Sequence, residues 1–191
     1  MDIRDAIIQI DGLFNLDLAA RLIKYIDNIE LQSLSVGDPG AGPNLDIRRV
    51  KGRFLKNDAN IKYNNISDFV FFQLIHNEIF KILPNYVGRF PKINLQKLIQ
   101  SDLLKYEVGG KYEVHTDSFL HANRALSCII NLNDSYTGGD ISFFDNMHHK
   151  EIMKCPLKKG GVLFFPSNFI YPHKISPIKK GTRYSIVSWL V

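Results

Sequence analysis

The chain has 191 residues, of which 45% are hydrophobic, 23% charged and 12% aromatic. These values are typical of a soluble globular protein and exclude the fibrous and disordered classes. No apolar run approaches the roughly 20 residues needed to span a bilayer. The first residues lack the pattern of a signal peptide, and the two cysteines are too few for a disulfide scaffold. We therefore expect one domain over residues 1–191, located in the cytoplasm, with no membrane partner.

The formal net charge is +5, from 24 Lys and Arg against 19 Asp and Glu. The basic residues fall in several short groups, and none reaches the about five consecutive like charges that are typical of a nucleic-acid-binding arm. The charge therefore does not favour a nucleic-acid partner, although it does not exclude one.

Two helices are predicted in the first half of the chain. The first follows Asn15, which is a suitable N-cap, and shows apolar residues at helical spacing. The second should begin after Ser67 and end before Pro84, with a buried stripe that includes Val70. Between the two helices, residues 33–44 are rich in Gly, Pro and Asp. We expect this segment to form a long surface loop.

The second half of the chain is typical of a β-rich fold, because short β-branched and aromatic segments alternate with Gly, Asn and Pro. In the last segment alternate residues should share a face, which places Arg183, Ser185 and Trp189 together. This pattern favours an α+β fold, with helical support and leading strands over residues 1–95 and a β-sandwich or jelly roll over residues 96–191. The strands are expected near residues 100–107, 112–115, 125–132, 140–145, 151–154, 161–165, 171–176 and 182–190.

A candidate metal site lies within this β region. In an extended segment residues i and i+2 point to the same side, so His115 and Asp117 can bind one ion together. His173, on another predicted strand, is the strongest candidate for a third ligand. Two histidines and one carboxylate on one face of an octahedron suit a non-haem Fe(II) that must also bind a co-substrate and O2. Arg183 can hold a carboxylate in a bidentate manner, and the hydroxyl of Ser185 can add a third hydrogen bond.

A resemblance to a known family rests first on the segment Tyr106-Glu-Val-Gly-Gly-Lys-Tyr112-Glu-Val-His115-Thr-Asp117. It resembles the Tyr-x-x-Gly-x-x-Tyr-x-x-His-x-Asp signature of prolyl 4-hydroxylase-type 2-oxoglutarate/Fe(II) oxygenases. The family fold is a double-stranded β-helix, which agrees with a jelly roll. Further matches follow in chain order at Arg124–Asn133, Gly138–Phe143, Lys159–Pro166, His173, Pro177, Gly181, Arg183–Ser185 and Trp189.

The resemblance implies a role for each of these site residues. His115, Asp117 and His173 would bind Fe(II). Arg183, together with Ser185, would hold the distal carboxylate of 2-oxoglutarate. The remaining implied residues are Tyr106, whose hydroxyl would also reach the co-substrate, and Tyr112, Trp189 and Arg124, which would line the metal pocket.

The reaction that the resemblance implies is hydroxylation of an unactivated C–H group, while 2-oxoglutarate and O2 yield succinate and CO2. Asp117 argues for hydroxylation, because related halogenases have a small residue at this position. A prolyl residue in a peptide or protein is the first substrate hypothesis, and ascorbate is a candidate reductant. The alternatives are a free amino acid, another small molecule or a nucleobase. Two further classes stay open: a non-catalytic binding module on the same fold, and a zinc-dependent hydrolase.

Substrate identity in such folds depends on loops and surface segments. We expect the 33–44 loop to face the substrate. The basic segment 48–53, interpreted as a strand, can attract an acidic partner but lacks the interleaved aromatic residues of a nucleic-acid stacking platform. The candidate substrate-facing residues are Arg48, Arg49, Arg53, Phe119 and His121.

Overall fold

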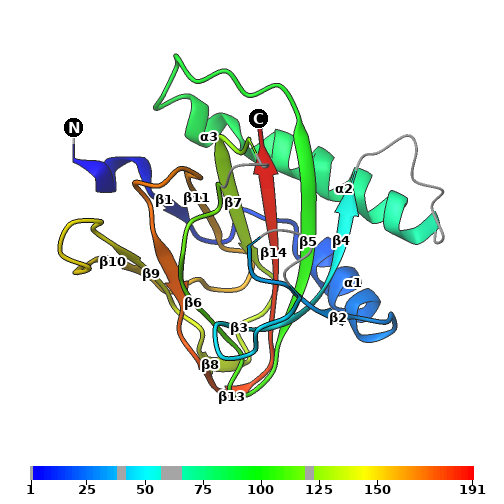
Figure 1. Ribbon diagram of the computed structural model, residues 1–191. Helices are drawn as coiled ribbons and strands as arrows, with labels where there is room; N and C mark the ends of the chain where they lie inside the picture. Colours follow the sequence, from blue (N-terminus) through cyan, green and yellow to red (C-terminus); the bar gives the residue numbers. More distant parts are fainter. Residues whose placement is uncertain (1, 38–41, 57–65, 119–122) are drawn as a thin grey trace.

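Two antiparallel sheets stack against each other to form a double-stranded β-helix, or jelly roll (Figure 1). The computed structural model describes residues 2–37, 42–56, 66–118 and 123–191. Within these residues the large sheet has the order β1-β11-β7-β14-β5-β4-β2, and the small sheet has the order β10-β9-β12-β6-β3. A short ribbon pairs β13 with β8. This architecture confirms the predicted α+β jelly roll.

The large sheet contains β1 (Ile8–Ile10), β11 (Val162–Pro166), β7 (Leu126–Asn131), β14 (Arg183–Leu190), β5 (Leu98–Tyr106), β4 (Lys51–Lys56) and β2 (Gln32–Ser33). The small sheet contains β10 (Glu151–Cys155), β9 (Ile141–Phe144), β12 (His173–Ile175), β6 (Lys111–His115) and β3 (Arg48–Arg49). The ribbon consists of β8 (Tyr136–Gly138) and β13 (Ile178–Gly181).

The α-helices cover the outer face of the large sheet, as the sequence predicts (Figure 1). They are α1 (Leu16–Asp27), α2 (Ile66–Ile82) and α3 (Pro84–Val87). The 3-10 helix η1 (Ile3–Ala6) instead contributes Ala6 to the apolar cluster between the two sheets. Asn15 caps α1, because its side-chain oxygen accepts a hydrogen bond from the Leu18 backbone N–H at 2.9 Å. None of the helices in the described ranges is both long and apolar enough to cross a membrane.

The two faces of β14 belong to two different apolar clusters. Ile186 and Leu190 pack with the helices, whereas Val187 and Trp189 pack between the two sheets. Because side chains alternate along a strand, Arg183 shares the inner face with Val187 and Trp189. The side chains of Arg183 and Ser185, the polar residues on this face of β14, therefore lie in the interior of the jelly roll.

The structure differs from the sequence-based expectations in three places. The basic segment 48–53 is divided: β3 joins the small sheet and β4 joins the large one, with Val50 between them. Val70 was expected to be buried, but it is 44% exposed, because the stripe that α2 buries runs through Phe72, Ile75, Ile79 and Ile82. Pro84 does not only end α2. It also occupies the first turn of α3, where its fixed φ fits a helix start.

Removal of a side chain between α2 and the large sheet should destabilise the fold. Ile75 is fully buried there, so Ile75→Ala should lower the free energy of unfolding by about 2–5 kcal/mol. Val70→Ala on the same helix is the matched control and should change it by less than about 0.5 kcal/mol. Urea unfolding measures both values, and equal losses would contradict the packing described here.

Candidate active site

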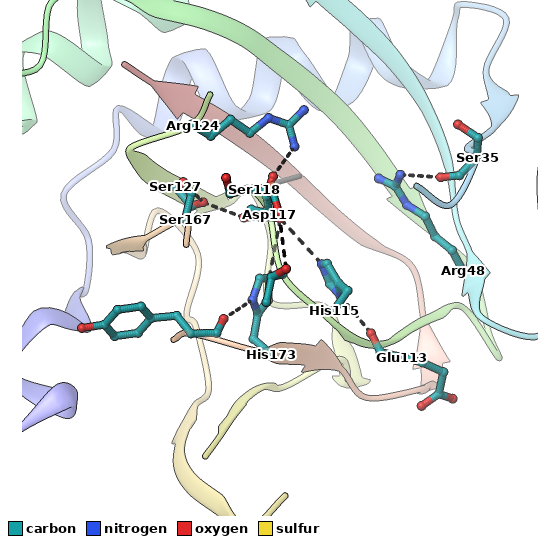
Figure 2. Close-up of polar contacts among 12 residues, drawn as sticks. Ser35, Arg48, Glu113, His115, Asp117, Ser118, Arg124, Ser127, Ser167 and His173 are labelled. Carbon is teal, nitrogen blue, oxygen red and sulfur yellow. Dashed lines mark hydrogen bonds and ion pairs between the residues drawn. The ribbon is translucent and has the colours of Figure 1, made fainter. Parts of the chain in front are cut away.

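Three potential metal ligands come together at one end of the neighbouring inner strands β6 and β12 of the small sheet (Figure 2). His115 ends β6 and His173 begins β12, and the two residues are direct partners in the β6–β12 pairing. Asp117 follows β6 by two residues. Its Oδ1 lies 3.7 Å from His115 Nε2 and 3.9 Å from His173 Nε2. One ligand atom from each residue lies within 4.8 Å of the others, so the three can share a single ion.

Both imidazoles are held in one orientation by backbone carbonyl groups. His115 Nδ1 lies 2.8 Å from the carbonyl oxygen of Glu113, and His173 Nδ1 lies 3.1 Å from that of Tyr171. A carbonyl oxygen only accepts hydrogen bonds, so Nδ1 carries the proton in each ring. The lone pair of each Nε2 is therefore left facing Asp117, as metal coordination requires.

The protonation states of the cluster also suit a metal. Burial, together with the nearby His173, lowers the pKa of His115 to about 3, so its ring is neutral at pH 7. Burial opposes ionisation of Asp117, but the adjacent His173 and His115 rings and the hydroxyl of Ser127 hold its pKa below the usual range. A neutral imidazole and an ionised carboxylate are the forms that bind a divalent cation.

A chain of buried serines fixes the carboxylate of Asp117. The Ser127 hydroxyl donates to Asp117 Oδ2 at 2.6 Å (Figure 2). Ser167 Oγ lies 2.8 Å from Ser127 Oγ, and since the only hydroxyl proton of Ser127 is used, Ser167 is the donor of this second bond. On the other side of the cluster, the ring of Tyr112 stacks on that of His115 with centroids 3.5 Å apart.

The cluster opens into a cavity of about 670 Å³ between the two sheets. The inner faces of β5 and β14 form its floor, with Tyr106 opposite Arg183 in the register of the two strands. Three other residues that the sequence analysis placed in the pocket also line this cavity, namely Tyr112, Arg124 and Trp189. The guanidinium carbon of Arg124 lies 3.5 Å from the centroid of the Trp189 ring, and its Nη1 donates to the Asp117 carbonyl oxygen at 2.9 Å.

Arg183 is a buried cation at the inner end of the cavity, with only 1% of its surface exposed. Its Nε donates to Asn131 Oδ1 at 3.2 Å, and its guanidinium lies over the Tyr106 ring. Its Nη2 and the hydroxyl of Ser185 are buried and have no hydrogen-bond partner among the described residues. Buried donors of this kind are costly unless a ligand supplies the acceptor. Gly139 provides the necessary space, because a Cβ there would lie 3.0 Å from the Arg183 side chain.

The five candidate substrate-facing residues are placed differently. Arg48 lines the cavity, where its guanidinium stacks on Tyr112 and donates to the Ser35 carbonyl oxygen at 2.9 Å. Arg49 lies outside the cavity on the exposed edge of β3, and the guanidinium of Arg53 binds the Asp68 carboxylate instead. Two candidates, Phe119 and His121, lie outside the described residues.

Several polar residues of the site were not predicted from the sequence. Ser127 and Asn131 both lie on β7, and Asp102 lies on β5. A single sequence gives one weak signal for Asp102: it stands four residues before Tyr106, at a spacing that shares a face in a strand. Ser127 and Asn131 can be assigned to the site only once the pairing of β7 with β14 is known. This pairing places Ser127 opposite Trp189 and Asn131 opposite Ser185.

Comparison with known proteins matches this part of the chain to one family. The model of the 2OG-Fe(II) oxygenase superfamily matches residues 101–191. A PKHD-type hydroxylase from Synechococcus sp. strain JA-2-3B'a(2-13) is 28% identical over 103 residues, which are 49% of this chain and 44% of that protein. The matched part of the chain thus spans less than half the length of this relative.

Solved structures share the fold over almost the whole chain. A prolyl hydroxylase from Trichoplax adhaerens, in complex with a peptide fragment of the hypoxia inducible factor oxygen degradation domain, has a TM-score of 0.76 at 15% identity, covering 97% of this chain and 83% of that one. A prolyl-4-hydroxylase from Pseudomonas putida has a TM-score of 0.70 at 18% identity, covering 97% and 91%. These likenesses establish the fold.

The serine chain predicts a measurable effect on metal affinity. Ser127→Ala removes the hydrogen bond that orients Asp117, so the affinity for Fe(II) or Mn(II) should fall by about 10- to 100-fold. Ser188→Ala is the matched control, because Ser188 is also buried but bonds Ser101 away from the cavity. Anaerobic titration calorimetry measures both affinities, and an unchanged affinity of the Ser127 variant would show that Asp117 needs no such support.

Proposed function

The chain belongs to the 2OG-Fe(II) oxygenase superfamily and is prolyl 4-hydroxylase-like, and from this premise we propose that it is a 2-oxoglutarate- and Fe(II)-dependent dioxygenase that hydroxylates an unactivated C–H group. One observation carries the proposal. A triad of two histidines and one carboxylate and a buried guanidinium without a full set of partners line the same cavity. Neither group of residues is explained by the stability of the fold alone.

The donor set of the triad fits Fe(II). Nε2 of His115, Nε2 of His173 and the carboxylate of Asp117 would hold the ion from one side, which leaves open positions for other ligands. The three ligands are already oriented by the Glu113 and Tyr171 carbonyl groups and by Ser127. A site arranged in this way needs little reorganisation to bind its metal.

The inner end of the cavity fits 2-oxoglutarate. Arg183 Nη2 and Ser185 Oγ are buried donors without an acceptor among the described residues, and both lie on the inner face of β14. A carboxylate between them would satisfy both, with Asn131 fixing the guanidinium through Nε. The Tyr106 ring under the guanidinium completes this carboxylate site.

Bound together, Fe(II) and 2-oxoglutarate supply the oxidising chemistry: O2, 2-oxoglutarate and a substrate R–H become succinate, CO2 and R–OH. The chain itself contributes binding, orientation and exclusion of water. Arg183 sets the direction of the co-substrate, and the stacked Tyr112 ring keeps His115 in place. Phe143 and Phe165 surround the ring of His173 with apolar surface and keep it dry.

We propose a prolyl ring in a peptide or protein as the target. The support is the likeness to prolyl hydroxylases, one of which was solved with a peptide fragment. A free amino acid or another small molecule is the alternative, and mass spectrometry for the gain of one oxygen atom separates them. We also propose that residues 1–191 act as one oxygenase unit, because β4 and Arg48 of β3 contribute to the wall of the same cavity.

Loss of a metal ligand should abolish the reaction. His115→Ala removes one of the three ligands, so Fe(II)-dependent formation of succinate from 2-oxoglutarate should fall to background while the far-UV circular dichroism spectrum is retained. His148→Ala is the control, because its side chain is 76% exposed in a turn. Full activity of the His115 variant would remove this residue from the iron site.

Loss of the buried guanidinium should act on the co-substrate. Arg183→Ala removes charge-assisted hydrogen bonds to a carboxylate, so the KM for 2-oxoglutarate should rise by about 10-fold or more. Arg183→Lys keeps the positive charge but cannot form the two parallel hydrogen bonds of a guanidinium. Its KM for 2-oxoglutarate should therefore lie between those of Arg183→Ala and the wild type. An unchanged KM in steady-state kinetics would refute the assigned role of Arg183.

A further inference from the structure

Asp102 is a buried acid in the cavity that the proposed reaction does not use. It lies on the inner face of β5, lines the cavity and is only 2% exposed. Its Oδ1 accepts a hydrogen bond from Gln100 Nε2 at 2.6 Å, and no described residue donates to its Oδ2. A buried carboxylate with a single hydrogen bond lacks the donors that normally stabilise its charge.

The electrostatic surroundings keep this acid charged but poorly satisfied. Burial raises the pKa of Asp102 to about 6, against the hydrogen bond from Gln100 and the charges of Arg48, Arg124 and Lys56. The carboxylate is therefore ionised at neutral pH, although it has little contact with water. No cationic side chain among the described residues forms an ion pair with it, and its one hydrogen bond comes from the neutral amide of Gln100.

The position of Asp102 separates it from the co-substrate site. Tyr106, opposite Arg183, is four residues further along β5, which corresponds to about 13 Å at the rise of a strand. Asp102 lies opposite Val187 of β14 and opposite Phe54 of β4. Phe54 is 47% exposed and also lines the cavity, so this part of the cavity leads to the surface.

The charged side chains on this side of the cavity suit a ligand that carries both a positive and a negative charge. Asp117 and Arg183 are assigned to the metal and the co-substrate, which leaves Asp102 with three cations in the cavity lining: Arg48, Arg124 and Lys56. A purely cationic substrate would be repelled by this surplus of positive charge. A molecule with a protonated amine and a carboxylate can satisfy Asp102 and the basic residues together.

We propose that the substrate binds with a protonated amine at Asp102 and a carboxylate at the surrounding basic side chains. This inference rests on the proposed function and specifies its substrate. The ring nitrogen of a prolyl residue within a peptide is an amide without a proton, so it cannot serve Asp102. The amine comes either from a free imino or amino acid, such as L-proline, or from a lysyl side chain beside the target prolyl residue.

Four probes distinguish these two sources. The first pair is L-proline and N-acetyl-L-proline, which keeps the carboxylate but loses the amine. The second pair is an end-blocked peptide with lysine and glutamate beside one proline, and the same peptide with the lysine acetylated. Each is added to the wild type, to Asp102→Asn and to the control Asp140→Asn, whose native carboxylate pairs with Lys154 away from the cavity. Binding is measured by the shift in Tm and by anaerobic calorimetry with Mn(II) and 2-oxoglutarate.

The wild type and Asp140→Asn should prefer one amine-bearing probe over its acetylated form by about 10-fold or more, which corresponds to a hydrogen bond between charged groups. Asp102→Asn should lose this preference while its affinity for Mn(II) and 2-oxoglutarate stays within about twofold of the wild type. The source of the amine is identified by which amine-bearing probe binds, L-proline or the lysine-containing peptide. Equal binding of the acetylated forms, an unchanged preference in Asp102→Asn, or no binding of any probe would overturn the inference.

Failure of the proposed function has a different signature. It would appear as wild-type protein that neither binds iron nor converts 2-oxoglutarate to succinate. The Tm shifts of the metal-free protein still report whether Asp102 prefers an amine, so the two results are read separately.

Discussion

The site depends on one cross-strand register, in which His173 of β12 lies opposite His115 of β6. This pairing brings two distant parts of the chain within reach of one ion, and Asp117 follows because it is two residues beyond His115. A shift of one residue in the register would turn an imidazole to the other face of the small sheet. The β9–β12 pairing, with Phe143 opposite His173, is the second contact that holds β12 in this register.

The inner face of the large sheet divides the cavity into two regions. The region at Arg183 and Ser185 offers buried donors to an anion, whereas the region at Asp102 offers a buried acceptor to a cation. Opposite charges on one continuous floor orient ligands as well as bind them. A co-substrate and a substrate that carry the matching charges would therefore meet at the triad in a defined order along β5 and β14.

The sequence predicts those parts of the site that depend on local periodicity. The same-side placement of His115 and Asp117, and that of Arg183 and Ser185, follows from the period of a strand. The roles of Ser127 and Asn131 were not predictable, because they depend on which strand lies beside β14. The break in the basic segment at Val50 was missed for the same reason, because the switch from one sheet to the other is set by pairing partners. Short strands such as β8 and β13 likewise have too few residues to show a pattern.

The most direct test of this account is a crystal structure of the protein grown anaerobically with Fe(II) and 2-oxoglutarate. We predict an anomalous iron peak bonded to Nε2 of His115, Nε2 of His173 and the carboxylate of Asp117. We also predict that the distal carboxylate of 2-oxoglutarate contacts Arg183 Nη2 and Ser185 Oγ, which are buried donors without an acceptor among the described residues. Iron bound elsewhere, or a co-substrate carboxylate that does not reach Arg183, would contradict the account.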